Sequence, residues 1–138
     1  MAKRESATRY CLFLSHSHKD RWIARQCARL IEEAAKQRIE VFLDEKDIEG
    51  GQSIPDSVRA AIKRCDEFLV LMTRYSKDRP WVLLEMGGAW ILDKYMVAII
   101  DKIGPREMPD IIYPYKAIDL NDFDTYPQQV LKRAKVTR

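Results

Sequence analysis

Four short, unbroken apolar runs limit most strongly what this chain can fold into. They are Tyr10–Leu14, Val41–Leu43, Phe68–Met72 and Met96–Ile100. Runs of this length, with no polar alternation, are typical of strands that are buried on both faces of a sheet. A fifth run, Tyr115–Leu120, mixes apolar and charged residues and is expected to form an edge strand.

Helical patterns lie between these runs. Trp22–Arg38 repeats apolar residues three and four positions apart, and Asp20 is placed to cap its N-terminus. Further helices are expected from near Pro55, over Pro80–Lys94 and over Thr125–Lys135. Strands that alternate with helices through short links predict right-handed crossovers and a parallel sheet. The expected class is α/β and flavodoxin-like, with a five-stranded, mainly parallel sheet and helices on both faces.

The composition fits a single globular domain and excludes several other classes. The 138 residues are 46% hydrophobic and 33% charged, which is enough for one core. The net charge of +3 is too small to indicate a nucleic-acid partner. No apolar run approaches the ~20 residues that cross a bilayer, and the N-terminus lacks the apolar core of a signal peptide. We expect one cytoplasmic domain over residues 1–138, with its core from about residue 8 to about residue 136 and no membrane partner.

Some individual residues are expected to be structural. Cys11, Cys27 and Cys65 are odd in number and form no CxxC motif, so reduced and buried thiols are expected. Trp22 and Trp90 are expected to lie in the core. Gly87 and Gly88 stand inside a predicted helix, where we expect them to allow close packing of that helix on the sheet.

Several known kinds of site are absent from the loops that follow the strands, where open parallel sheets bind ligands. No GxGxxG, GxxxxGK[ST] or GxSxG motif occurs, which excludes a Rossmann dinucleotide site, a P-loop and a hydrolase elbow. The third run ends in Met72–Thr73–Arg74 without the aspartate that a phosphoacceptor domain needs. His16 and His18 have no further ligands nearby in the sequence, so no metal site is expected.

Three stretches, taken in order, carry the functional information. They read YCLFLSHSHKD over Tyr10–Asp20, VFLDEKDIEGGQSIPDSVRAAI over Val41–Ile62, and SKDRPWVLLEMGGAW over Ser76–Trp90. Together they resemble a Toll/interleukin-receptor (TIR) domain, in particular the bacterial stand-alone type that cleaves NAD+. The resemblance extends from Tyr10 to about Val136 and implies the same flavodoxin-like fold.

Glu85 is the residue on which the chemistry is expected to depend. The window Trp81–Ile91 is apolar apart from this carboxylate, and Trp81 lies four residues earlier on the same helix face. Burying an unpaired carboxylate costs several kcal/mol, which indicates either a partner or a function. The alternative is a glutamate on the exposed side of the helix, paired with Arg79 or Lys94.

The resemblance implies which residues act and on what. It gives Glu85 the role of the catalytic carboxylate that cleaves NAD+ at the nicotinamide–ribose bond, with NAD+ as substrate and no cofactor. The substrate pocket is then lined by His16, Ser17, Asp44, Glu49, Gly51 and Trp81. Some catalytic relatives have an arginine where this chain has Ser17 or His18, so the contact to the pyrophosphate is left open between Lys19, Lys46 and Arg74.

The resemblance also implies partners and leaves alternatives open. Self-association through TIR–TIR contacts is expected, mediated by the Asp44–Pro55 loop, which also borders the substrate. A separate sensor or effector protein is a further expected partner. Similar short bacterial chains are the signalling arm of antiphage defence. The product is left open between ADP-ribose, a cyclic isomer and base exchange. The alternative functions are a non-catalytic TIR adaptor and a nucleoside deoxyribosyltransferase, whose related sheet also places a glutamate near ribose.

Overall fold

A five-stranded parallel sheet forms the centre of the computed structural model, which describes residues 9–43, 55–110 and 117–137. Its strands are β1 (Tyr10–Ser15), β2 (Ile39–Leu43), β3 (Glu67–Met72), β4 (Tyr95–Ile100) and β5 (Ala117–Asp119). Their order across the sheet is β2-β1-β3-β4-β5, and every neighbouring pair runs parallel. This is the flavodoxin-like order, so the predicted fold class is confirmed.

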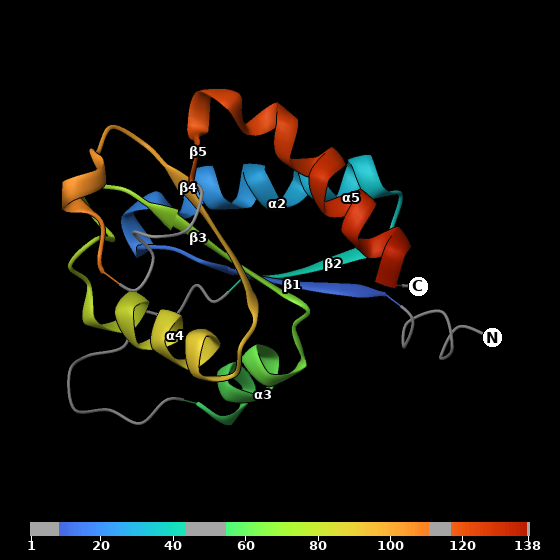
Figure 1. The fold of residues 1–138 in the computed structure, drawn as a ribbon, viewed down its shortest axis with the longest axis horizontal. Coiled ribbons are helices and arrows are strands. Elements are labelled where there is room, and N and C mark those ends of the chain that lie inside the picture. Colours follow the sequence, from blue (N-terminus) through green and yellow to red (C-terminus); the bar gives the residue numbers. More distant parts are fainter. Residues whose placement is uncertain (1–8, 44–54, 111–116, 138) are drawn as a thin grey trace.

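Helices cover both faces of this sheet. Helices α2 (Arg21–Ala35) and α5 (Tyr126–Thr137) lie on one face, and α3 (Asp56–Arg64) and α4 (Pro80–Ile91) lie on the other (Figure 1). Short 3-10 helices complete the connections, namely η1 (His18–Asp20), η2 (Pro105–Glu107) and η3 (Leu120–Thr125). The predicted helices are therefore present, and the described part of Asp101–Pro114 is a loop with one short turn.

Two predicted helices end earlier than the sequence pattern suggests. The helix expected to reach Arg38 stops at Ala35, because Lys36 and Gln37 take left-handed φ values of 50° and 69°. The helix expected to reach Lys94 stops at Ile91, and Asp93 is left-handed with a φ of 58°. Left-handed residues end an α-helix by turning the chain back, and here each turn leads directly into the next strand.

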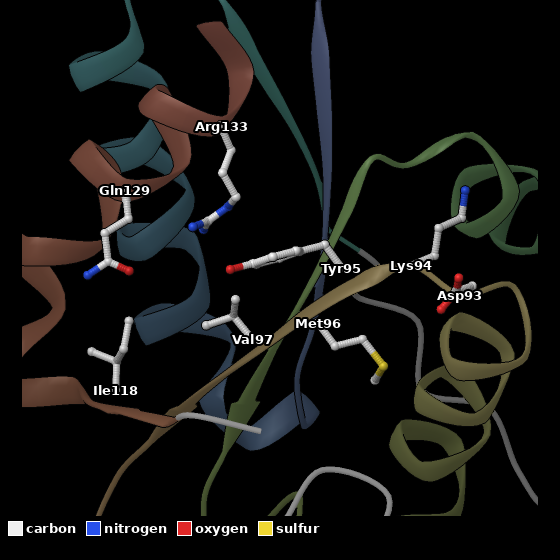
Figure 2. Close-up of a pocket in the computed structure, with 8 residues that line it drawn as sticks. All are labelled: Asp93, Lys94, Tyr95, Met96, Val97, Ile118, Gln129 and Arg133. Atoms are coloured by element: carbon white, nitrogen blue, oxygen red, sulfur yellow. The ribbon is translucent and has the colours of Figure 1, made fainter. Parts of the chain in front are cut away.

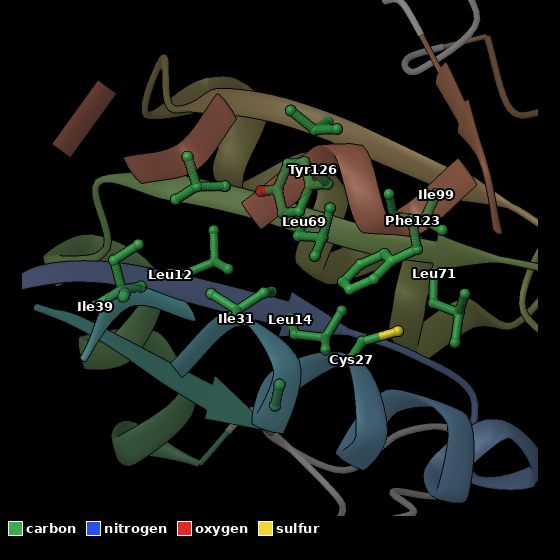
Figure 3. Packing of buried hydrophobic residues seen from close by; sticks show 14 of the residues in the cluster. Leu12, Leu14, Cys27, Ile31, Ile39, Leu69, Leu71, Ile99, Phe123 and Tyr126 are labelled. Atoms are coloured by element: carbon green, nitrogen blue, oxygen red, sulfur yellow. The ribbon is translucent and has the colours of Figure 1, made fainter. Parts of the chain in front are cut away.

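Apolar side chains pack into one cluster on each face of the sheet. On the α2/α5 face, strand residues such as Leu12, Leu69 and Ile99 pack against Ile31 and Tyr126 (Figure 3). On the other face, the rings of Phe13 and Phe68 stack at 5.3 Å beneath α3 and α4. All six residues of β3 are buried, which explains why its sequence reads as a continuous apolar run.

Both tryptophans expected in the core are exposed, so that prediction was wrong. Trp22 is 68% exposed because the buried stripe of α2 runs through Ala24, Cys27 and Ile31 and leaves Trp22 outside it. Trp90 is 55% exposed on the outward side of α4. The cysteine prediction holds for Cys27 and Cys65, which are buried and free, whereas Cys11 is half-buried. Among the described residues, no helix is both long enough and apolar enough to cross a bilayer.

Candidate active site

Buried polar side chains gather at the carboxyl edge of the sheet. Ser15 ends β1, and His16 and Ser17 follow it directly; Thr73 follows β3. All four are at most 4% exposed, as is Glu85, which reaches the same edge from α4. Polar groups are costly to bury without partners. Each group of this cluster therefore needs either a hydrogen bond within the protein or one from a ligand.

The Glu85 carboxylate lies inside the protein, with 1% of the residue exposed. The Ser15 hydroxyl donates a hydrogen bond to Glu85 Oε1 at 2.5 Å, across 70 positions of sequence. This excludes the alternative in which Glu85 lies on the exposed side of the helix. Ser15 itself was not predicted as a site residue; its only sequence signal is that it ends the first apolar run.

Trp81 lies one turn before Glu85 on α4 and is partly buried against the cluster that contains Phe13 and Phe68. This placement agrees with the prediction that Trp81 and Glu85 lie on the same face of one helix. Contact between the Trp81 ring and a substrate stays a prediction.

His16 has one engaged and one unpartnered ring nitrogen. Its Nδ1 lies 2.8 Å from the carbonyl oxygen of Ser17; because a carbonyl only accepts, Nδ1 carries the proton. Its Nε2 is buried and has no hydrogen-bond partner among the described residues. A neutral His16 can therefore accept a hydrogen bond from a ligand hydroxyl at Nε2. Ser17 is engaged in the backbone, since its hydroxyl accepts from the Lys19 N–H at 3.2 Å and caps η1.

A second buried carboxylate, Asp20, stands near His16 and was expected only as a helix cap. Its side chain makes no capping hydrogen bond; instead the Thr73 hydroxyl donates to Asp20 Oδ2 at 2.6 Å. Burial raises the pKa of Asp20, while the Thr73 hydrogen bond opposes that rise. The sequence places Asp20 and Thr73 on different loops, and only the adjacency of β1 and β3 brings them together.

Two of the three candidate cations meet at one aromatic ring beside this site. Lys19 Nζ lies 5.3 Å from the centroid of the Tyr75 ring, and the Arg74 guanidinium lies 4.8 Å from it. Arg74 also donates to the Tyr75 hydroxyl at 2.7 Å. Such cation–π contacts hold both positive charges at the carboxyl edge.

Four sequence predictions fall outside the described residues, namely Asp44, Glu49, Gly51 and the cation Lys46. Their part in the site stays a prediction. Within residues 9–43, 55–110 and 117–137, no group of three or more His, Cys, Asp or Glu side chains is arranged to hold a metal ion.

The third buried carboxylate, Glu67, is fully engaged in a structural network at the opposite, amino edge of the sheet. Arg133 donates to it from Nε and Nη2, both at 2.8 Å, and the Tyr10 hydroxyl donates at 3.0 Å. The Tyr126 hydroxyl donates as well. Burial, helped by the Glu67 charge, raises the pKa of both tyrosines. Arg133 supplies the positive charge that balances Glu67. Glu67 therefore links β1, β3 and α5 and has a structural role, not a ligand-binding one.

A cavity of about 430 Å3 opens beside this network (Figure 2). Tyr95, at the start of β4, stands at its centre with the Arg133 guanidinium 4.4 Å from its ring, and Gln129 of α5 faces the same space. The remaining lining residues are Asp93, Lys94, Met96, Val97 and Ile118. None of them was predicted for the site, and the cavity lies at the amino end of β4, so it is separate from the Glu85 edge.

Comparison with solved structures shows the same fold in proteins of distant sequence. The TIR domain of the Toll-related receptor TRR-2 from Hydra magnipapillata aligns with a TM-score of 0.65 and 16% identity, over 90% of this chain and 97% of that one. The TIR domains of the activated Roq1 resistosome, which recognises the pathogen effector XopQ, align with a TM-score of 0.62 and 17% identity, over 90% and 98%. The CMP N-glycosidase BcmB of Clostridium botulinum aligns with a TM-score of 0.55 and 18% identity, over 87% and 97%.

At the level of sequence, no curated protein matches the chain. A family model described as the TIR domain matches residues 12–134. That span runs from within β1 to within α5 and contains Ser15, His16 and Glu85. The chain therefore belongs to the TIR domain family.

Proposed function

We propose that this chain cleaves NAD+ at the nicotinamide–ribose bond, with Glu85 as the catalytic carboxylate. The observation that carries the proposal is the burial of Glu85 at the ligand-binding edge of the sheet, held at Oε1 by the Ser15 hydroxyl.

The reaction needs a negative charge more than it needs an acid. When the bond between ribose C1′ and the pyridinium nitrogen breaks, its electron pair neutralises the departing nicotinamide, and positive charge develops at C1′. A carboxylate held in a site of low dielectric constant stabilises that charge without reorganising. Water then bonds to C1′ and releases a proton, which gives ADP-ribose; attack by a group of the same molecule gives a cyclic product instead.

The neighbouring groups fit the other parts of the substrate. His16 Nε2 has no partner in the part of the chain that the structure describes, so it is available to accept a hydrogen bond from a ribose hydroxyl. Lys19 and Arg74, gathered at Tyr75, are suited to the pyrophosphate, for which this chain has no arginine at Ser17 or His18. Reversing either charge, as in Arg74→Glu, is expected to raise KM for NAD+ with a smaller change in kcat.

A second candidate is an N-glycosidase that acts on a mononucleotide. BcmB, which shares this fold, is a CMP N-glycosidase, and its named reaction also breaks a bond between a base and ribose. The alternative function of a nucleoside deoxyribosyltransferase also requires a buried carboxylate near the ribose. A TIR adaptor without catalysis makes no such demand.

The wider setting of the activity is part of the proposal. We infer a cytoplasmic protein of bacterial immune signalling, whose TIR domain associates with other copies of itself and responds to a separate sensor. The Roq1 resistosome is an assembly that contains several TIR domains, which supports self-association here.

The test is to incubate the protein with NAD+, with CMP and with deoxynucleosides, and to separate the products by chromatography. Wild-type protein is expected to release nicotinamide, and Glu85→Gln is expected to lose about 10²–10³-fold in rate, the usual cost of one preorganised electrostatic group. Glu33→Gln, which removes a carboxylate from the exposed surface of α2, is the matched control and should retain full activity. Equal turnover by Glu85→Gln and wild type would overturn the assignment.

A further inference from the structure

The outward face of α4 is apolar throughout. Leu83, Leu84, Trp90 and Ile91 are 37%, 50%, 55% and 76% exposed, and Gly87 lies between them on the same face. Glu85, the one charged residue of this helix, is buried on the opposite side. Apart from the indole N–H of Trp90, the face offers no hydrogen-bonding side chain. A helix that is apolar all round is normally buried, so this face is built to be covered.

Gly87 adds an independent observation. A glycine inside a helix costs about 1 kcal/mol relative to alanine, so it needs a reason. The packing of the described residues supplies none, because a Cβ built on Gly87 meets none of their atoms within 4 Å. The expectation that Gly87 allows α4 to pack closely on the sheet is therefore wrong. What the missing side chain does provide is a flat place at the centre of the outward face, where another backbone can approach.

We propose that the outward face of α4, defined as Leu83, Leu84, Gly87, Trp90 and Ile91, docks against the same face of a second copy of this chain. An uncharged surface selects a partner by shape and apolar character alone, and two copies of one such surface meet that requirement about a two-fold axis. The other large exposed apolar residues of the described helices, Trp22 and Leu30 on α2, stand eight positions apart and form no comparable patch.

The size of the face indicates how strong the contact is. With these exposed fractions, four large side chains present on the order of 400 Å2 of apolar surface. A standard interface buries about 800 Å2 per partner, so the α4 pair forms a weak dimer that is populated only at high protein concentration. The face lies opposite Glu85 on the same helix, so docking leaves access to the carboxyl edge unchanged.

This inference rests on the self-association proposed above, but its test uses the protein without NAD+ and does not depend on catalysis. Sedimentation velocity is expected to show a weight-average mass that rises from monomer toward dimer between about 10 μM and about 1 mM protein, the range of a weak association. Ile91→Glu and Ile91→Lys should each weaken association at least tenfold, because each places like charges at the two-fold contact. Circular dichroism checks that both variants remain folded.

Two comparisons fix the surface and its partner. Trp22→Glu changes a tryptophan on α2 that is more exposed than Trp90 and should associate like wild type, whereas Trp90→Glu should remain monomeric. An equimolar mixture of Ile91→Glu and Ile91→Lys should associate again, because opposite charges then face each other across the contact. A wild-type protein that stays monomeric at about 1 mM, equal effects of the two tryptophan variants, or no recovery in the mixture would overturn the proposal. So would binding of monomers to phosphatidylserine vesicles that Trp90→Glu abolishes.

Discussion

The Ser15 hydroxyl donates a hydrogen bond to Glu85, which links the end of β1 to the catalytic carboxylate proposed on α4. The 2.5 Å hydrogen bond joins a serine and a glutamate that are both buried, at 0% and 1% exposure. It fixes the position of Oε1 relative to the sheet edge, where the ribose of a substrate would lie. Ser15 is therefore a positioning residue for Glu85 rather than a catalytic one.

Replacing Ser15 with alanine is expected to lower kcat for NAD+ cleavage about tenfold, because the carboxylate then loses one preorganising contact. KM should change less, since Ser15 is not placed against the pyrophosphate cations. The matched control is Ser76→Ala, which removes another fully buried serine hydroxyl, one that donates to the Leu71 carbonyl at 2.8 Å. That control should lower the melting temperature without lowering kcat. A kcat for Ser15→Ala equal to that of Ser76→Ala would contradict the positioning role.

The Glu67–Arg133 pair should be far more important to stability than any surface pair. Arg133→Met leaves the Glu67 carboxylate buried without its countercharge, which typically costs about 3–5 kcal/mol. Urea denaturation measures this loss. Arg29→Met breaks the exposed Arg29–Glu33 pair, whose charged atoms are 3.6 Å apart, and should cost less than about 1 kcal/mol. Similar losses in the two variants would show that Glu67 does not depend on Arg133.

The cysteines should react in an order set by burial. Burial raises the pKa of Cys27 and Cys65 to about 11, so at about pH 8 roughly one thiol in a thousand is the reactive thiolate. Titration of the native protein with a thiol reagent is expected to modify half-buried Cys11 first and the other two only on unfolding. Cys11→Ser should remove the fast phase. Fast modification of all three thiols in the folded protein would contradict the burial shown here.

The parts of the fold that could be predicted are those that the local pattern of apolar and polar residues determines. The parts that were missed depend on contacts between residues that are distant in sequence. The apolar run Phe68–Met72 identified β3, but the strand begins at Glu67, a charged residue that is buried only because Tyr10, Tyr126 and Arg133 reach it from other elements. No pattern in the sequence around Glu67 predicts those partners.

The same distinction holds for the candidate site. Glu85 was predictable because it is a lone carboxylate in an apolar window. Its partner Ser15 and the Asp20–Thr73 pair were not, because strand order decides which loops become neighbours. The exposed Trp90 was missed for a related reason: an apolar helix sequence does not reveal which side faces the sheet.

Removing the Asp20–Thr73 hydrogen bond is expected to lower the free energy of unfolding by an amount that depends on pH. Burial raises the pKa of Asp20 in the folded protein. The stabilising contribution of the protonated Asp20 carboxyl to folding is therefore fully present below its ordinary pKa, and it is lost as the pH rises through its pKa in the folded protein. Thr73 opposes that loss by donating to the charged form at 2.6 Å. Thr73→Val is therefore expected to cost about 1.5–3 kcal/mol near pH 7, where a hydrogen bond to a charged group is lost, and about 0.5–1.5 kcal/mol near pH 3.5, where the acid is neutral.

Urea denaturation of wild type and Thr73→Val at both pH values measures this difference. Thr125→Val is the matched control, because the Thr125 hydroxyl donates to the Asp122 carbonyl at 2.8 Å and no carboxylate is involved. Its cost should be the same at the two pH values. The backbone N–H of Tyr75, which donates to Thr73 Oγ1 at 3.0 Å, adds a pH-independent cost to Thr73→Val, so the informative quantity is the change in cost with pH. If that change is zero, Thr73 does not stabilise a charged Asp20, and the buried carboxyl beside His16 must be protonated at neutral pH.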